Sequence, residues 1–204
     1  MSTVPVRKYT PEEYLALERA APYKSEYFAG EIFAMSGASL SHILIVKNLV
    51  RCLDEALDGK DFLVLPTDMR VKCPTGLLTY PDIVITCANP QFDDLRKDTL
   101  LNPMALIEVL SPSTEAYDRG KKFEHYREIN SLQEYVLVAQ DHPLVEKFVR
   151  PNSGSWGWSA QNSLDDSLIL ASCGATVRLS DVYAGVEFPP ATIADIVPMN
   201  REPR

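Results

Sequence analysis

Two apolar stretches of this sequence each carry one carboxylate, and this combination restricts the fold more than any other feature. The stretch "YPDIVITC" places Asp82 at the entry of a strand, directly before "IVIT". The stretch "MALIEVLSPST" places Glu108 between Leu, Ile and Val residues, in the middle of a second strand. A carboxylate in such surroundings costs several kcal/mol unless a cation compensates it. The fold must therefore bring positive charge to both strands.

Two kinds of cation can meet this need. Carboxylates from two strands form a typical cradle for a hard divalent cation, and the backbone carbonyl of Val109 is a candidate third oxygen ligand. The alternative is that each acid pairs with an Arg or Lys inside the fold. The segment "DRGKKFEHY" supplies Lys121 and Lys122 just after the Glu108 strand, so that a helix there can bring a lysine back over the carboxylates. Such a lysine can position or deprotonate water, or stabilise a developing negative charge.

The N-terminal half predicts a helix, a hairpin and a second, longer helix. "TPEEYLALERA" starts with a capping box, in which Thr10 is the N-cap and Glu13 its partner. "SEYFAGEIFAMSG" predicts two strands joined at Gly30. Residues 39–58 predict the clearest helix, because apolar residues recur there at steps of three and four. The predicted apolar stripe consists of Ile43, Val46, Val50, Leu53 and Leu57.

Strands dominate the rest of the chain. "DFLVLP" predicts a short buried strand and "DMRVKC" an alternating one with its charged residues on one face, whereas residues 88–102 are polar and loop-like. We expect a helix from Glu115 or Asp118 to Ile129, a strand in "SLQEYVLVAQ" and a hairpin into "LVEKFVR". The C-terminal part predicts a short β-meander and a brief helix near Val182.

These elements favour one mixed α/β domain, in which helices flank a central β-sheet, with an N-terminal helix and a C-terminal β-meander. We expect the domain to span residues 1–204, with flexible tails at about 1–8 and 199–204. No stretch approaches the length of a membrane span, and the N-terminus lacks the apolar core of a signal peptide. A cytoplasmic location without membrane partners is therefore expected. The 4 cysteines form no CxxC pair, which argues against a zinc ribbon.

The order of these motifs resembles a known superfamily. Pro-Asp, then Glu on the next buried strand, then a lysine is similar to the PD-(D/E)xK nucleases, which have the restriction-endonuclease-like fold. The resemblance is stronger to a large bacterial family of restriction-endonuclease-like proteins of unknown function, and it extends over nearly the full chain. The stretches that carry it are "YTPEEYLALE", "SEYFAGEIFAMSGAS" followed by "SH", "YPDIVIT", "LIEVLSPSTEAYDRGKKFEHYR" and "SLQEYVLV".

The resemblance implies a catalytic triad of Asp82, Glu108 and Lys122, in which the two acids are metal ligands. In the superfamily the lysine usually lies two residues after the glutamate, but Leu110 stands at that position here. The family resemblance moves the lysine to the following helix. Lys122 matches that place better than Lys121, which remains the alternative.

The resemblance also implies accessory residues around this triad. Glu31 resembles the additional acid of many such nucleases, His42 falls where the family usually has histidine, and Tyr126 lies one helical turn after the lysine. Glu26 matches the family pattern as well, but a pairing role within the fold is the preferred interpretation. Ala139 departs from the pattern, because the family often has an aspartate there.

The expected function is a Mg²⁺- or Mn²⁺-dependent endonuclease that hydrolyses DNA as a homodimer. The sequence has no GxSxG, Walker or GxGxxG motif that would favour another enzyme class. The net charge of −8, however, argues against a broad face that binds nucleic acid. Two alternatives follow: a non-catalytic nuclease-fold module that binds a partner, and a metal-dependent hydrolase of small phosphoesters. A nuclease needs cations beside its acids, and the candidates are Arg70, Lys72, Arg119, Lys121 and Lys122.

Overall fold

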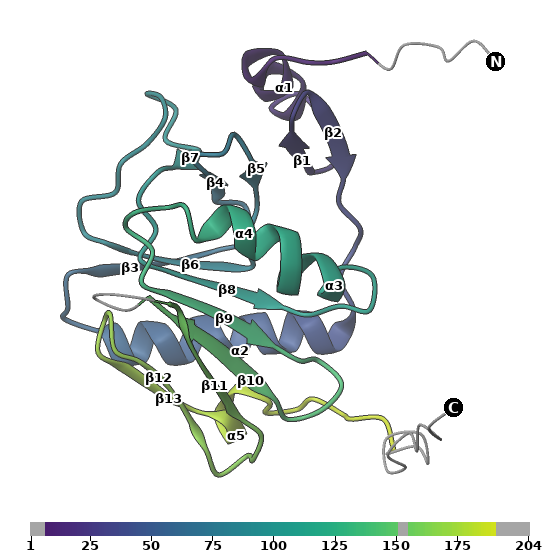
Figure 1. Ribbon diagram of the computed structural model, residues 1–204. Helices are drawn as coiled ribbons and strands as arrows, with labels where there is room; N and C mark the ends of the chain where they lie inside the picture. Colours follow the sequence, from purple (N-terminus) through teal and green to yellow (C-terminus); the bar gives the residue numbers. More distant parts are fainter. Residues whose placement is uncertain (1–6, 151–154, 191–204) are drawn as a thin grey trace, which may run out of the picture.

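A six-stranded mixed β-sheet forms the centre of the molecule, and helices cover both of its faces (Figure 1). The computed structural model describes residues 7–150 and 155–190. The strand order is β11-β10-β9-β8-β6-β3, and β8 pairs with β9 in parallel while the other neighbours are antiparallel. The strands are β3 (Phe62–Pro66), β6 (Ile83–Cys87), β8 (Ala105–Val109), β9 (Glu134–Val138), β10 (Val145–Val149) and β11 (Gly157–Gln161).

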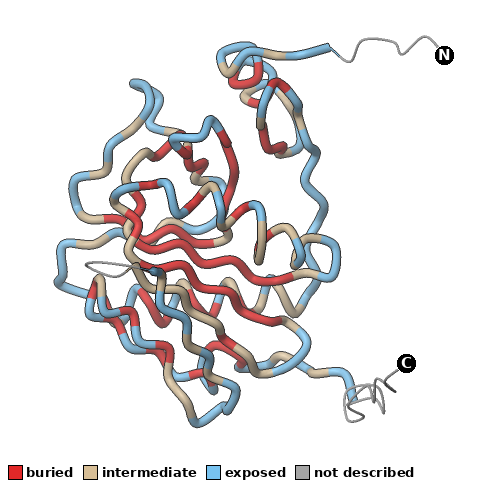
Figure 2. The backbone as a smooth tube through the Cα atoms, in the orientation of Figure 1, coloured by how far each residue is buried: buried red, intermediate tan, exposed pale blue. Residues whose placement is uncertain are grey.

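The two faces of the central sheet belong to two separate cores. Side chains alternate along a strand, so Ile107 and Val109 of β8 join the core under helix α2 (Leu40–Leu57), whereas Leu106 and Leu110 join the core on the opposite face. Every residue of β8 and β9, and all of β6 except Cys87, is therefore buried, and these strands form the red centre of Figure 2. By its place in this alternation, Glu108 belongs to the second face.

Helix α2 confirms the predicted helix and, in part, its predicted apolar stripe. Ser39 caps the helix by accepting a hydrogen bond from the amide of His42. Leu53 and Leu57 of the stripe are buried, and Val46 and Val50 pack against the core while partly exposed, but the buried face also includes Ile45, Asn48, Leu49 and Cys52. Ile43 remains 53% exposed. Apolar residues run along two adjacent faces of this helix at the same spacing, so the period alone could not identify the face that the sheet buries.

A second sheet, in the order β2-β1-β5-β4-β7, carries the N-terminal part of the chain. It consists of β1 (Ser25–Phe28), β2 (Glu31–Ala34), β4 (Arg70–Lys72), β5 (Leu78–Thr79) and β7 (Thr99–Leu100), and helix α1 (Pro11–Glu18) packs beside it. The predicted hairpin and capping box are both present. Strand β7 arises from the segment that was expected to be only a loop, and it pairs in parallel with β4.

The predicted burial of one strand needs correction, and a charged side chain of another strand is buried. Arg70 of β4 is surrounded by Asp98, Thr99 and the rings of Tyr14 and Tyr80, which leave it 2% exposed. Strand β3 is only partly buried, because it forms the edge of the central sheet.

The helix expected to end at Ile129 forms in three parts. α3 (Glu115–Tyr117) leads into a π-helix, η1 (Asp118–Lys122), which continues as α4 (Phe123–Tyr126). A π-turn adds one residue to the helical repeat and is frequent at functional sites. This helix covers the face of the central sheet to which Glu108 belongs (Figure 1).

The C-terminal strands divide between two sheets. β11 extends the central sheet, whereas β12 (Ser167–Leu170) and β13 (Ala175–Arg178) pair only with each other and pack on the α2 side together with α5 (Leu179–Val182). Among the described helices, none has the length and hydropathy to cross a membrane. Most of the two predicted tails, residues 1–6 and 199–204, lies outside the described residues.

Candidate functional site

The strand register brings Asp82 and Glu108 opposite each other. Ile83 pairs with Ile107 across the antiparallel β6 and β8 strands. One position further along this register, Asp82 faces Glu108, and opposite residues of an antiparallel pair point to the same side of the sheet. Asp82 precedes the strand directly, so its carboxylate lies at the sheet margin and is half-buried, whereas Glu108 is only 4% exposed.

The π-helix brings Lys122 to Glu108. The ammonium nitrogen Nζ of Lys122 lies 2.9 Å from Oε1 of Glu108, and 3.4 Å from both Oε1 of Glu26 and Oδ1 of Asp118. Lys122 is 4% exposed. Burial alone would lower its pKa, but the three carboxylates together raise this pKa well above its usual value. Lys122 is therefore an ammonium ion inside a cage of acids.

Glu108 holds the position between Lys122 and Tyr126. The hydroxyl of Tyr126 donates a hydrogen bond to Oε1 of Glu108 over 2.8 Å, and this is the same oxygen that Lys122 contacts. Among the described residues, none donates a hydrogen bond to the other oxygen, Oε2. Burial, with Asp118 and Asp82 adding to it against the opposing effect of Lys122, raises the pKa of Glu108 to about 8. A further cation at this carboxylate would lower its pKa again.

Asp82 is held by one side chain and one backbone amide. Nε2 of His42, in the first turn of α2, lies 3.0 Å from Oδ1 of Asp82. The amide of Val109 donates to Oδ2 over 2.8 Å. The predicted role of Val109 concerned its carbonyl, and the contact that the structure places on Asp82 comes from the amide instead.

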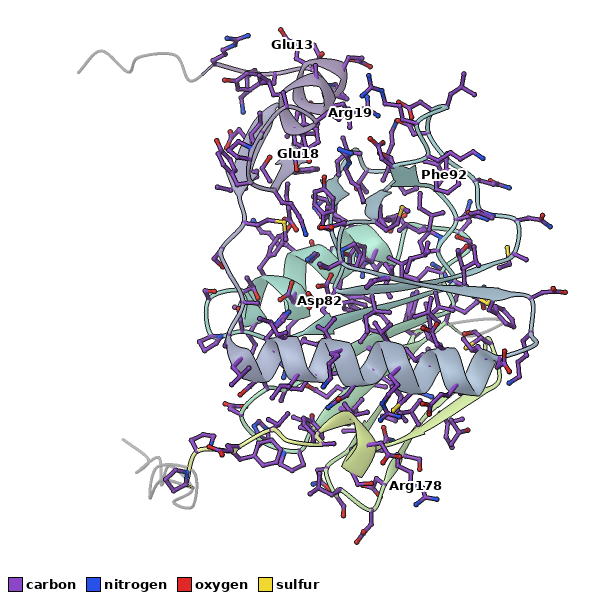
Figure 3. All side chains as sticks on the ribbon, turned by 180° about the vertical axis from the view of Figure 1, so that it is seen from behind. Glu13, Glu18, Arg19, Asp82, Phe92 and Arg178 are labelled. Atoms are coloured by element: carbon purple, nitrogen blue, oxygen red, sulfur yellow. The ribbon has the colours of Figure 1, made fainter. Side chains whose placement is uncertain are left out.

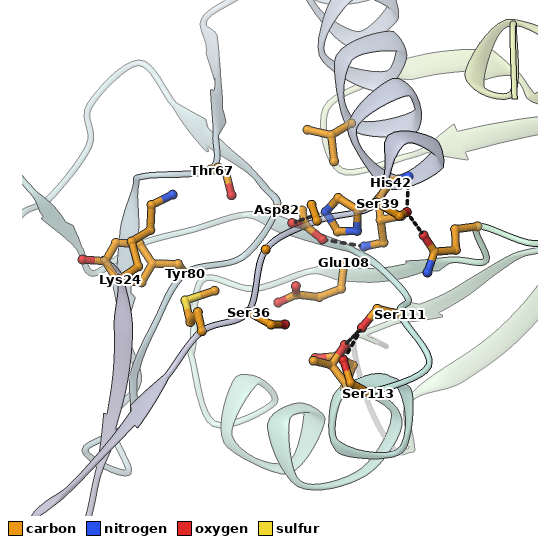
Figure 4. Close-up of a pocket in the computed structure, with 18 of the residues that line it drawn as sticks. Lys24, Ser36, Ser39, His42, Thr67, Tyr80, Asp82, Glu108, Ser111 and Ser113 are labelled. Carbon is orange, nitrogen blue, oxygen red and sulfur yellow. Dashed lines mark hydrogen bonds and ion pairs between the residues drawn. The ribbon is translucent and has the colours of Figure 1, made fainter. Parts of the chain in front are cut away.

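These residues line one pocket of about 1140 Å³ at the junction of the two sheets (Figure 4). Asp82, Glu108, Lys122 and His42 all contribute to its lining. Figure 4 shows Glu108 pointing into the pocket between Ser36 and Ser111, and His42 beside Asp82. Seen from behind, Asp82 lies in the middle of the molecule above α2 (Figure 3).

Several sequence-based candidates lie elsewhere. Glu31 does not reach the pocket, because it stands at the turn end of the β1–β2 hairpin, where it pairs with Lys8. Lys121 is exposed and does not line the pocket, which favours Lys122 over it. The other predicted flanking cations are also absent from the pocket, because they form ion pairs within the fold: Arg70 with Asp98, Lys72 with Asp93, and Arg119 with Glu115 and Glu146.

Two acids of the cluster were not predicted as site residues. Glu26 of β1 accepts a hydrogen bond from Thr79 and contacts Lys122, so the preferred interpretation of Glu26 as a pairing residue agrees with its contacts. Asp118 precedes Lys122 by one helical turn, and this i,i+4 spacing was a signal available in the sequence. Both acids line the pocket.

The donor atoms of the pocket suit a magnesium ion. Within the described part of the chain, no three His, Cys, Asp or Glu side chains gather in the arrangement of a complete metal cage. Mg²⁺ rarely uses such a cage, because it keeps several waters and binds through one or two carboxylates together with substrate phosphates. Asp82 and Glu108 provide two carboxylates on one pocket wall, and Oε2 of Glu108 has no described donor. These two residues therefore fit a hard divalent cation.

Comparison with protein families assigns the chain to one of them. The family model described as "Uma2: Putative restriction endonuclease" matches residues 11–180. The chain belongs to this family. The resemblance drawn from the sequence motifs is thereby confirmed, and the matched segment includes every residue of the carboxylate–lysine cluster.

Two relatives in Synechocystis are similar over most of their length. The uncharacterized protein slr1290 is 35% identical over 187 residues, which are 91% of this chain and 97% of the relative. The uncharacterized protein sll1609 is 34% identical over 148 residues, or 72% of this chain and 84% of the relative.

A solved structure shares the fold. It is described as "a putative nuclease belonging to DUF820" from Anabaena variabilis, and it matches with a TM-score of 0.68 over 84% of this chain and 96% of that chain. The two sequences are 19% identical, so the likeness concerns the fold alone. It confirms the expected mixed α/β architecture.

Proposed function

We propose that this protein is an endonuclease that hydrolyses phosphodiester bonds of DNA with the help of Mg²⁺ or Mn²⁺. The observation that carries the proposal is the joint placement of Asp82, Glu108 and Lys122 in one pocket, with a buried ammonium against a carboxylate that faces a second one. Membership of the restriction endonuclease family supports it. Asp82 and Glu108 would hold the metal, which when bound polarises a phosphate and lowers the pKa of a coordinated water.

The side chains of the pocket have separate roles in this proposal. Lys122 remains positive because three carboxylates surround it, so it serves as a fixed cation that stabilises negative charge on the phosphate oxygens rather than as a base. Tyr126 fixes the orientation of the Glu108 carboxylate. His42 and the Val109 amide fix that of Asp82. Ligand orientation of this kind maintains the affinity of a metal site.

The test combines metal binding with cleavage. Calorimetric titration of Mn²⁺ and nicking of circular DNA, both supercoiled plasmid and a single-stranded circle, are measured for the wild type, for Glu108→Gln and for Glu134→Gln. Glu134 is the matched control, because it is equally buried on the neighbouring strand but contacts Ser172 and Lys147 away from the pocket. We expect Glu108→Gln alone to lose both metal binding and nicking. Absence of Mn²⁺ binding by the wild type would contradict the proposal.

A second candidate function is a non-catalytic module that keeps the nuclease fold and binds a partner. The observation in its favour is that Arg70, Lys72 and Arg119 pair with acids of the fold instead of flanking the pocket. This candidate predicts a wild type that neither binds Mn²⁺ nor nicks plasmid, so the same experiment separates the two functions. The expected homodimer remains a prediction, which light scattering on the purified protein can test.

A further inference from the structure

Three exposed apolar side chains, the apolar wall, line the same pocket as the acids. Phe33 and Met35 from β2 and its following link are 48% and 37% exposed, and Ile43 of α2 is 53% exposed. All three line the pocket, together with Val46 and Val50 of α2, which are partly buried against the core. Exposed apolar side chains that gather in one pocket mark a binding surface.

The pocket has few cations to bind phosphates. The lysines in its lining are Lys24, Lys47 and Lys122. Lys24 forms an ion pair with Asp68, and Lys122 is surrounded by three carboxylates. Proteins that bind duplex DNA neutralise many phosphates with Lys and Arg, and that electrostatic contribution dominates their affinity. The net charge of −8 also weighs against tight binding of duplex DNA.

This combination of surfaces favours one class of substrate. An unpaired base has both of its faces free, and stacking of bases on aromatic side chains supplies affinity to proteins that bind single strands. In a duplex the faces of the bases are stacked on each other, and the protein meets the phosphates and the base edges in the grooves instead. An apolar wall beside a cation-poor catalytic pocket therefore suits a single strand better than a duplex.

We propose that the wall of Phe33, Met35 and Ile43 binds an unpaired base next to the phosphate that a metal ion at Asp82 and Glu108 would bind, so that the substrate is single-stranded DNA or the single-stranded part of a larger DNA. The inference rests on the proposed nuclease function. The wall and the acids belong to one continuous pocket, and Glu26 and Phe33 are paired residues of the β1–β2 hairpin, so the hairpin links the lysine cage to the wall.

The test measures binding separately from cleavage. A short fluorescein-labelled deoxyoligonucleotide, alone or annealed to its complement, is titrated with protein in Ca²⁺ buffer and followed by anisotropy. We expect tighter binding of the single strand, with a slope of log K against log salt no steeper than about −2, since at most three lysines can contact phosphates. Phe33→Ala and Ile43→Ala are expected to weaken this binding, the former by about 10-fold.

The matched control for Ile43→Ala is Ile169→Ala, since Ile169 lies on β12 outside the pocket and is 54% exposed. Melting curves of all variants verify folding, and exposed wall residues are expected to tolerate truncation. Equal or tighter binding of the duplex, or no effect of Phe33→Ala, overturns the inference while plasmid nicking still supports the nuclease function. Failure of the wild type to bind or cut either form overturns both. Hydrolysis of bis(p-nitrophenyl) phosphate without binding of either oligonucleotide also overturns it, in favour of a small phosphoester substrate.

Discussion

Nζ of Lys122 lies 2.9 Å from Oε1 of Glu108 although the lysine comes from a helix and the glutamate from the central strand of the sheet. In the superfamily pattern that the sequence resembles, the lysine would stand two residues after the glutamate, where this chain has Leu110. Leu110 is buried in the core on the same face. Lys122 of the helix therefore provides the positive charge that the strand lacks at Leu110.

Replacement of Lys122 by methionine is expected to lower the free energy of unfolding by about 3 kcal/mol or more, because removing one partner of a buried ion pair leaves uncompensated charge. Glu108, Glu26 and Asp118 would all lose their common cation. Urea unfolding measures the loss, and plasmid nicking should disappear as well. Lys121→Met is the matched control, because Lys121 is the exposed neighbour and its loss should change stability by less than about 0.5 kcal/mol. Equal effects of the two substitutions would contradict the assignment of the lysine.

The ion pair of Asp98 with Arg19 predicts a stability that depends on pH. The Arg19 guanidinium hydrogen-bonds Asp98 and lowers the pKa of that carboxyl from 3.8 to about 2. A lowered pKa stabilises the fold above the unfolded value, and this contribution is lost as pH falls from about 4 to about 2. Because the Asp98 side chain is 31% exposed, we expect a contribution of about 1 kcal/mol rather than the full shift.

Asp98→Asn measures this contribution. The difference in unfolding free energy between the wild type and Asp98→Asn should be largest near neutral pH and should shrink as the carboxyl of the wild type is protonated. Asp54→Asn serves as the comparison, since Asp54 is exposed on α2 and forms no ion pair within the described chain. A wild-type advantage over Asp98→Asn that stays constant down to about pH 2 would disprove the assignment.

The two acids of the site could be predicted from local signals, because Asp82 and Glu108 each interrupt an apolar strand. The residues alone offered both Lys121 and Lys122, and only the family resemblance favoured Lys122. The face that α2 buries was not predictable from its period, since Ile43 and Ile45 belong to adjacent apolar faces and only the docked sheet selects one.

The sequence also could not show which acid of the β1–β2 hairpin reaches the site. Glu26 and Glu31 both lie on β1–β2, and both were possible partners of the site. Glu26 reaches Lys122, whereas Glu31 lies nearer the turn and meets Lys8 instead. The distance of each residue from the turn was known from the sequence, but how the hairpin sits against the π-helix depends on tertiary packing. Likewise Arg70 was a candidate cation beside the acids, and its pairing with Asp98 depends on a segment distant in the sequence.

His42 is expected to control metal affinity with little effect on folding. His42→Ala removes the contact with Oδ1 of Asp82 but leaves the hydrogen bond from the Val109 amide. Loss of a residue that orients a ligand typically weakens metal binding 10- to 100-fold, as a rough guide. Calorimetric titration of Mn²⁺ measures this change. The control is His125→Ala, because His125 contacts Thr75 outside the pocket and should leave Mn²⁺ affinity unchanged. Unaltered Mn²⁺ affinity in His42→Ala would show that Asp82 needs no support from the histidine.

The π-turn at Asp118–Lys122 is expected to be essential for the site, although its sequence carries no signal for it. Insertion of one alanine after Gly120 would exceed the single residue that the π-turn adds and would turn the residues on one side of the insertion by about 100° relative to those on the other. Asp118 and Lys122 could then no longer both face Glu108 while Tyr126 keeps its place. We expect loss of nicking and of Mn²⁺ binding, with circular dichroism still showing a folded mixed α/β protein.

Gly120→Ala separates this effect from any need for glycine itself. Apart from its chain neighbours and the backbone of its own helix, no atom lies within 4 Å of the position that a Cβ would occupy on Gly120, so the alanine variant should keep both nicking and stability. Alanine also favours helical backbone over glycine by up to about 1 kcal/mol, so its melting temperature should not fall. If the insertion variant nicks plasmid as fast as Gly120→Ala, the helix must re-form the lysine cage in another register, and the length of the π-turn would then have no role in catalysis.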